Sequence, residues 1–156
     1  YSTFNPAVLR SIRNIIKCGR EAGIMVGMCG EAAAGVCSDD PSKFGKVLIL
    51  QLLPGTQGIY GLLMAFLIFI RIGLLGDGMM DLTLSQGLYI LASGIPIGLV
   101  GIWSGIAQGK AAAAGIMLLG KRSDQMAKGI IYAAMVETYA IFALLISILM
   151  LFNLGI

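Results

Sequence analysis

The chain has 156 residues, of which 58% are apolar and only 12% are charged, and its formal net charge is +3. Soluble domains carry about one charged residue in four, so this composition excludes an ordinary soluble enzyme and indicates a protein surrounded mostly by lipid. The small positive charge does not require nucleic acid as a partner, because basic residues in short loops commonly mark the cytoplasmic side of a membrane protein.

Residues 1–26 form a basic segment. Four cationic residues share one face of a predicted helix, at spacings of 3, 4 and 3: Arg10, Arg13, Lys17 and Arg20. The uncharged stretch after Arg20 and Glu21, at 22–30, is shorter than the ~20 residues a spanning helix needs. Three accounts are open: a helix lying on the membrane surface, an inner helix whose basic face meets a pore with lipid headgroups or water, or a stretch that is not the natural sequence. We favour the inner helix, because the first hairpin otherwise lacks a partner.

Three apolar runs follow, at 47–70, 82–109 and 129–156, with no Lys, Arg or Asp and a single Glu among them. Each exceeds the ~20 residues needed to cross a membrane. They lack the two-residue alternation of a membrane strand, so they predict helices. We therefore expect an all-α, multi-pass cell-membrane protein with four transmembrane helices.

Polar connections at 38–46, 71–81 and 120–128 join these helices. Basic residues concentrate in the first and third connections, which predicts that both face the cytoplasm. The basic N-terminal segment argues for the opposite orientation.

The two halves of the chain are similar to each other. Gly-Glu-Ala-Ala-Ala at 30–34 matches Gly-Lys-Ala-Ala-Ala at 109–113, which indicates a duplicated helical hairpin. We predict a first hairpin over 1–78, with its atypical basic start, and a second over 79–156 that carries the ion-binding Glu137.

The third span carries a glycine at almost every turn of one side: Gly94, Gly98, Gly101, Gly105 and Gly109. The first segment has a similar series: Gly23, Gly27, Gly30 and Gly35. Small residues let helix backbones approach closely. The pattern suits a crowded inner layer of a ring, with the second and fourth helices towards lipid, but also ordinary helix pairing within one chain. We favour the ring.

Glu137 is the only acidic residue of the fourth span. It follows Lys128 by nine residues, which places it ~13 Å into the membrane at ~1.5 Å per residue. A carboxylate there costs on the order of 2.5 to 3.5 kcal/mol. We therefore expect Glu137 to be protonated, paired or bound to a cation.

Other polar residues fall at a similar depth: Thr56, Gln57, Tyr60 and Gln108. They either satisfy one another at a helix interface or surround an ion together with Glu137, and we favour the ion. Pro54 should add a kink, because proline leaves the carbonyl four residues earlier, at Leu50, without its helical donor. Carboxylate, amide, hydroxyl and carbonyl oxygens suit a hard cation. They favour Na+, although the same groups can hydrogen-bond a protonated carboxyl.

A softer metal has little support. The chain contains no His, and its cysteines follow no metal-binding spacing: Cys18, Cys29 and Cys37. We interpret them as small apolar fillers.

Three motifs in order carry a family resemblance: LQLLPGTQGIYG at 50–61, SGIAQGK at 104–110 and MVETYA at 135–140. Together they resemble the K subunits, or proteolipids, of bacterial sodium-translocating V-type ATPases, over roughly residue 27 to the C-terminus. The resemblance implies a four-helix protomer of a homo-oligomeric rotor ring that carries Na+, without an organic cofactor. It implies sodium ligands on these residues: the main-chain carbonyl of Leu53, the side chains of Thr56, Gln57 and Gln108, and the carboxylate of Glu137. Tyr60 matches the tyrosine that hydrogen-bonds this carboxylate.

The resemblance also implies partners: a stator subunit with an essential arginine, a central-stalk subunit at loops 38–46 and 120–128, and membrane lipid. The chain has no P-loop of the form G-x-x-x-x-G-K-[ST], so we expect no ATPase activity of its own. Two alternatives remain open: a proton-carrying rotor of the same family, and a four-helix membrane scaffold or pore that transports nothing.

Overall fold

The computed structural model describes residues 5–76, 78 and 80–153, and within them all regular structure is helical. The α-helices are α1 (Pro6–Asp39), α2 (Phe44–Leu52), α3 (Thr56–Arg71), α4 (Leu84–Lys121) and α5 (Met126–Phe152). Short 3-10 turns lie between them: η1 (Pro41–Lys43), η2 (Leu53–Gly55) and η3 (Ser123–Gln125). The predicted all-α class is confirmed.

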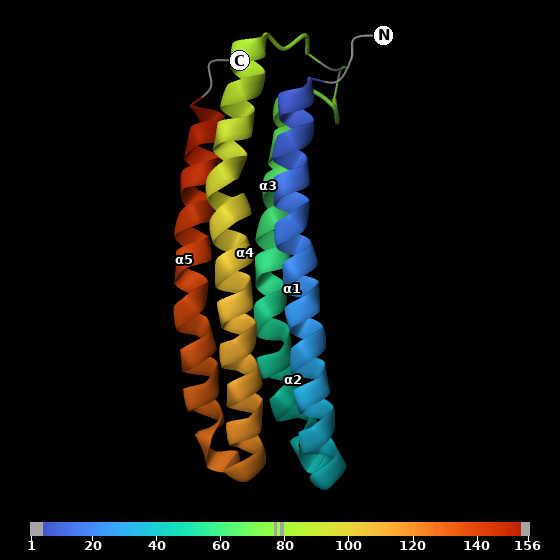
Figure 1. Cartoon of the computed structure of the whole chain (residues 1–156), viewed down its shortest axis with the longest axis vertical. Coiled ribbons are helices and arrows are strands. Elements are labelled where there is room, and N and C mark those ends of the chain that lie inside the picture. The colour runs from blue at the N-terminus through green and yellow to red at the C-terminus, as the bar shows by residue number, and fades with distance from the viewer. Residues whose placement is uncertain (1–4, 77, 79, 154–156) are drawn as a thin grey trace.

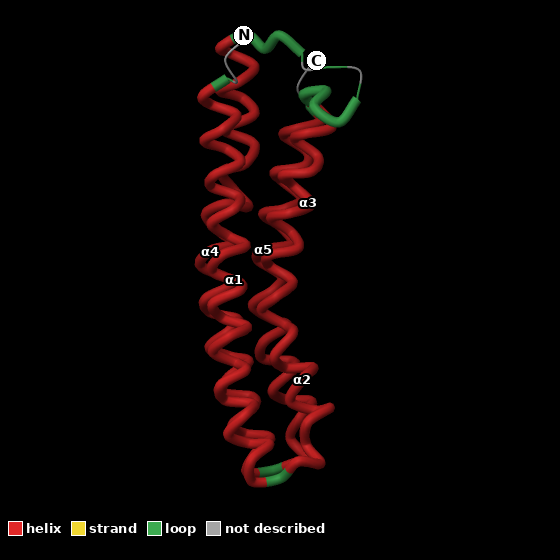
Figure 2. Tube along the Cα trace, turned by 90° about the vertical axis from the view of Figure 1, so that its right-hand side faces the viewer, coloured by secondary structure: helices red, strands yellow, loops and turns green. Residues whose placement is uncertain are grey.

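The long helices form one elongated bundle, in which α1 and α4 run parallel to each other and antiparallel to α2–α3 and α5 (Figure 1). The turn after α1 and the turn after α4 lie at the same end, while the connection from α3 to α4 lies at the other. Figure 2 shows two layers: α1 and α4 form one, and α2, α3 and α5 form the other. As expected, the first and third helices (α1 and α4) share one layer, and the second and fourth (α2–α3 and α5) share the other.

Among the described residues, three helical stretches are long and apolar enough to cross a membrane: Pro41–Arg71, Leu84–Lys121 and Ser123–Phe152. The protein is therefore a multi-pass membrane protein, as predicted. Helix α1 is not apolar enough to join this group, yet its 34 residues rise roughly 51 Å at about 1.5 Å per residue.

Helix α1 packs inside the bundle along its whole length, which contradicts the surface-lying account. One face is buried, including Val8, Ile15, Cys18, Ala22 and Met25. The cationic residues point away from it and are all exposed: Arg10, Arg13, Lys17 and Arg20. This arrangement agrees with an inner helix whose basic face turns away from its own bundle.

The glycine stripe of α4 faces α1, except at Gly105, which lies beside Gln57 of α3. A Cβ at Gly109 would lie 2.5 Å from the Cβ of Met25, and one at Gly98 would lie 3.4 Å from the Cβ of Asn14. A Cβ at Gly101 would overlap the sulfur of Cys18. Close packing of α4 against α1 within the chain therefore accounts for glycine at these three positions, and it is compatible with an inner layer of a ring.

Apart from Gly30, which lies against Gln51, the glycines of the α1 series behave differently. A Cβ at Gly23, Gly27 or Gly35 would meet no other atom within 4 Å. These positions are not needed for packing inside one chain.

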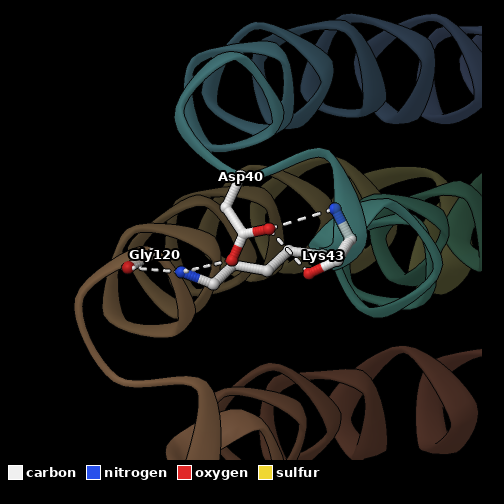
Figure 3. Close-up of polar contacts among 4 residues, drawn as sticks. Asp40, Lys43 and Gly120 are labelled. Atoms are coloured by element: carbon white, nitrogen blue, oxygen red, sulfur yellow. Dashed lines mark hydrogen bonds and ion pairs between the residues drawn. The ribbon is translucent and has the colours of Figure 1, made fainter.

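The two hairpins are joined at the turn end by Lys43 (Figure 3). Its Nζ donates a 2.9 Å hydrogen bond to the carbonyl of Gly120, at the end of α4, and lies 3.5 Å from Oδ2 of Asp40. Asp40 also accepts bonds from the hydroxyl and the amide of Ser42, and the Ser42 side chain is the main cause that holds the pKa of Asp40 below its usual value. At the opposite end, the guanidinium of Arg71 lies over the ring of Phe152.

Two buried apolar clusters fill the bundle. One lies towards the α3–α4 connection and includes Ile15, Met64, Ile68, Ile90 and Leu151. The other lies towards the turn end and includes Cys29, Val47, Leu50, Ile116 and Ala133. A layer of polar side chains separates them.

Candidate ion-binding site

The helix of α2 and α3 is interrupted where Pro54 was expected to kink it. The chain changes to a 3-10 turn over Leu53–Gly55 before α3 begins. The carbonyl of Leu53 accepts from the backbone N–H of Thr56 and, at 2.8 Å, from the Thr56 hydroxyl. The proline alone pointed to the Leu50 carbonyl, whereas the oxygen that gains a side-chain donor at the kink belongs to Leu53.

A chain of hydrogen bonds crosses the bundle from α4 to α5. The hydroxyl of Ser104 donates to Oε1 of Gln57 at 3.0 Å, and Nε2 of Gln57 donates to Oε1 of Gln108 at 3.0 Å. Nε2 of Gln108 then lies 3.4 Å from Oε2 of Glu137. Gln57 and Gln108 are completely buried, so these amides depend on one another for partners.

The other carboxylate oxygen of Glu137 is held from α3. The phenol of Tyr60 donates to Oε1 at 2.5 Å, a length typical of a strong hydrogen bond to a charged acceptor. Glu137 is half-buried, and its two oxygens thus receive donors from two different helices. Both oxygens of Glu137 act as acceptors in this arrangement.

Thr56 completes the layer from the kink. It precedes Tyr60 by four residues on α3, so both side chains lie on one face of that helix. The structure thus gathers Thr56, Gln57, Tyr60, Gln108 and Glu137 in one layer, with the Leu53 carbonyl beside Thr56. Their roles as ion ligands stay predictions.

Two residues of this layer were missed in the sequence. Ser104 is 7% exposed and holds Gln57; its position four residues before Gln108, on the same helical face, was the available signal. Cys18, interpreted as an apolar filler, is fully buried, and its thiol lies 3.3 Å from the backbone carbonyl of Gln57. The thiol of Cys29 donates similarly to the carbonyl of Gly109.

The chemistry of the layer fits a hard monovalent cation. It offers one carboxylate with amide, hydroxyl and carbonyl oxygens, which are ligands that hard cations prefer. Within the described residues, no group of three or more His, Cys, Asp or Glu residues could hold a metal ion. A single negative charge balances a single positive charge, so a loaded site is neutral.

Comparison with known proteins agrees with this interpretation. Residues 18–68 and 91–150 match the family model of the ATP synthase C subunit. The V-type sodium ATPase subunit K of Enterococcus hirae is 56% identical over 128 residues, covering 82% of this chain and 78% of the relative. The A-type ATP synthase subunit K of Methanocaldococcus jannaschii is 38% identical over 133 residues, covering 85% of this chain and 56% of the relative.

Proposed function

Because this chain belongs to the family of ATP synthase C subunits, we propose that it is a rotor-ring subunit of a V-type ATPase that carries Na+ across the membrane during ATP-driven rotation. In this role it moves the ion, and ATP is hydrolysed by another subunit. No organic cofactor is needed for this task.

One observation carries the proposal: Glu137, the lone carboxylate of its span, accepts from Tyr60 and Gln108 inside a layer of oxygen-bearing side chains. We assign the ion to these ligands: the Leu53 carbonyl, the side chains of Thr56, Gln57 and Gln108, and the carboxylate of Glu137. Tyr60 supports the carboxylate by its hydrogen bond. A proton would need the carboxyl group alone, so the surrounding oxygens, together with the name of the E. hirae relative, favour Na+ over H+.

The duplicated hairpins set how many ions a ring carries. The family model matches two separate segments, 18–68 and 91–150, which supports hairpins over 1–78 and 79–156. Aligning the two halves places Gly55 opposite Glu137, so the first hairpin has no carboxylate at the matching position. Each protomer then binds one ion with four helices.

The ring needs partners in order to do work. We place a stator subunit with an essential arginine against the half-exposed side of Glu137, where that cation can replace the ion's charge. The loops 38–46 and 120–128 lie together at one end of the bundle, where a central-stalk subunit binds them. Membrane lipid covers the outer helices.

Equilibrium binding of radioactive Na+ to purified rings tests the proposal. We expect Glu137→Gln to abolish binding, because the amide is nearly isosteric but cannot neutralise a cation. Glu31→Gln, the same chemical change on the exposed part of α1, should leave binding intact. A wild-type ring that binds no Na+, in an intact ATPase that pumps protons, would favour the proton-carrying alternative, and a ring whose ATPase transports neither ion would favour a scaffold.

A further inference from the structure

The hydrogen-bond chain of the site has a direction. Ser104 donates to Gln57, Gln57 donates to Gln108, and Gln108 donates to Glu137. Every donor therefore points towards the carboxylate. Glu137 is thus the final acceptor of the chain, a role that a carboxylate oxygen fills well because it has lone pairs to accept with.

A bound cation needs the opposite direction. With the chain as it stands, Gln108 presents its NH2 group to Glu137, and its oxygen is occupied by Gln57. An ion beside the carboxylate repels NH2 groups and attracts amide oxygens. The terminal torsion of a glutamine is broad and roughly twofold, so each amide can exchange its oxygen and nitrogen by a half-turn without leaving its place.

If both amides turn, Gln108 presents its oxygen to the ion and its NH2 group to the oxygen of Gln57. The NH2 group of Gln57 then faces Ser104. A hydroxyl is both a donor and an acceptor, so Ser104 can donate to Gln57 in the first direction and accept from it in the second. The buried amide of Gln57 keeps a partner in both.

We propose that Ser104 is a positioning residue. Its hydroxyl ends the hydrogen-bond chain through Gln57 and Gln108, and it changes from donor to acceptor when the two amides turn on uptake of Na+. Ser104 does not bind the ion but acts through Gln57 and Gln108. The inference rests on the function proposed above and adds a residue outside the assigned ligand set.

Removing the Ser104 hydroxyl destabilises both arrangements of the hydrogen-bond chain, but to different extents. An orphaned buried N–H is tolerated less well than an under-satisfied carbonyl oxygen. Ser104→Ala leaves a carbonyl oxygen of Gln57 under-satisfied in the empty site, but an N–H of Gln57 without an acceptor in the loaded site. The loaded site is therefore penalised more, and the affinity for Na+ falls.

The test measures the dissociation constant of radioactive Na+, and the rise in ring melting temperature on adding Na+, for matched variants. Ser93→Ala is the control, because Ser93 is also fully buried on α4 but donates only to the Ile90 carbonyl of its own helix. Ser104→Thr keeps the hydroxyl, and Ser104→Val has the same shape without it. This pair repeats the comparison if Ser104→Ala fails to assemble.

We expect Ser104→Ala and Ser104→Val to weaken Na+ binding by roughly threefold to tenfold, the range for one hydrogen bond, and to reduce the stabilisation by Na+. Ser104→Thr and Ser93→Ala should bind like the wild type. Equal affinity in all four variants, with or without a lower melting temperature in the absence of Na+, would overturn the proposal while leaving the carrier function intact. A wild-type ring that fails to bind Na+ would instead reject the carrier function and this inference with it.

Discussion

Nε2 of Gln108 lies 3.4 Å from Oε2 of Glu137, a long contact across the packing of α4 against α5. The second oxygen of the same carboxylate receives a 2.5 Å hydrogen bond from Tyr60 on α3. The hydrogen bond to Oε1 of Glu137 is thus much shorter than the contact to Oε2. The Gln108 side is the one that an entering ion displaces more easily.

Gln108→Leu should weaken Na+ affinity by more than tenfold, or about 1.4 kcal/mol, because a buried coordinating or hydrogen-bonding group is lost. Na+ titration of purified rings measures the change. Gln51→Leu is the matched control, since Gln51 also lies within a membrane span but approaches Gly30 of α1. Unchanged affinity with a less stable ring would mean that Gln108 only joins helices.

Glycines on α1 and α4 should respond differently to enlargement. Gly101→Leu drives a side chain into Cys18 and should lower the stability of the single chain by about 1–3 kcal/mol, as overpacking commonly does. Gly27→Leu meets open space within the chain, so it should affect only the assembly of protomers. Thermal unfolding of solubilised protein and the yield of intact rings separate the two effects. A lower unfolding temperature of the single chain in Gly27→Leu would contradict this prediction.

The turn-end contact predicts a pH dependence. The pKa of Asp40 lies below its ordinary value of 3.8, chiefly through the Ser42 hydroxyl. A lowered pKa in the folded protein stabilises the fold above the unfolded pKa, and this contribution disappears as the pH falls through the folded value. The melting temperature of the wild type should therefore drop more steeply below about pH 4 than that of Asp40→Asn. Asp39→Asn, the same charge change one residue earlier, should follow the wild type.

The charge of Glu137 should control rotation. A loaded site is neutral, whereas an empty carboxylate facing lipid costs on the order of 2.5 to 3.5 kcal/mol, comparable with the ~2.3 kcal/mol needed to move one ion against 100 mV. A protomer with an empty site should be able to rotate only where the stator arginine offsets the charge of Glu137. Replacing that arginine with a neutral residue should stop sodium-coupled rotation but leave Na+ binding to the isolated ring unchanged. Coupled pumping that continues in this mutant would contradict the mechanism.

Much of the fold follows from the sequence, because apolar runs, polar connections and the depth of Glu137 are local or additive properties. They predicted the α class, the shared end of the two turns and the layer that unites Gln57, Gln108 and Glu137. Pro54 also indicated a kink within the second helix.

Side-chain partners across helices were harder to predict. Helical spacing gives the face of Ser104 but not the rotamer of Gln57 that meets it, and a buried cysteine is interpreted as a filler until its thiol is seen near the Gln57 carbonyl. The glycine stripe shows a similar limit: spacing reveals that a neighbour comes close, and the structure identifies that neighbour as α1 of the same chain.

The central claim, that Glu137 holds Na+ in the resting ring, is tested most directly by its reaction with a carboxyl-modifying carbodiimide. A cation on the carboxylate blocks the protonation that this reaction requires. We predict that modification of Glu137 slows as Na+ is added at constant pH, with half-protection near the dissociation constant for Na+, and that K+ at the same ionic strength protects much less. A reaction rate that depends on pH but is unaffected by Na+ would contradict the claim.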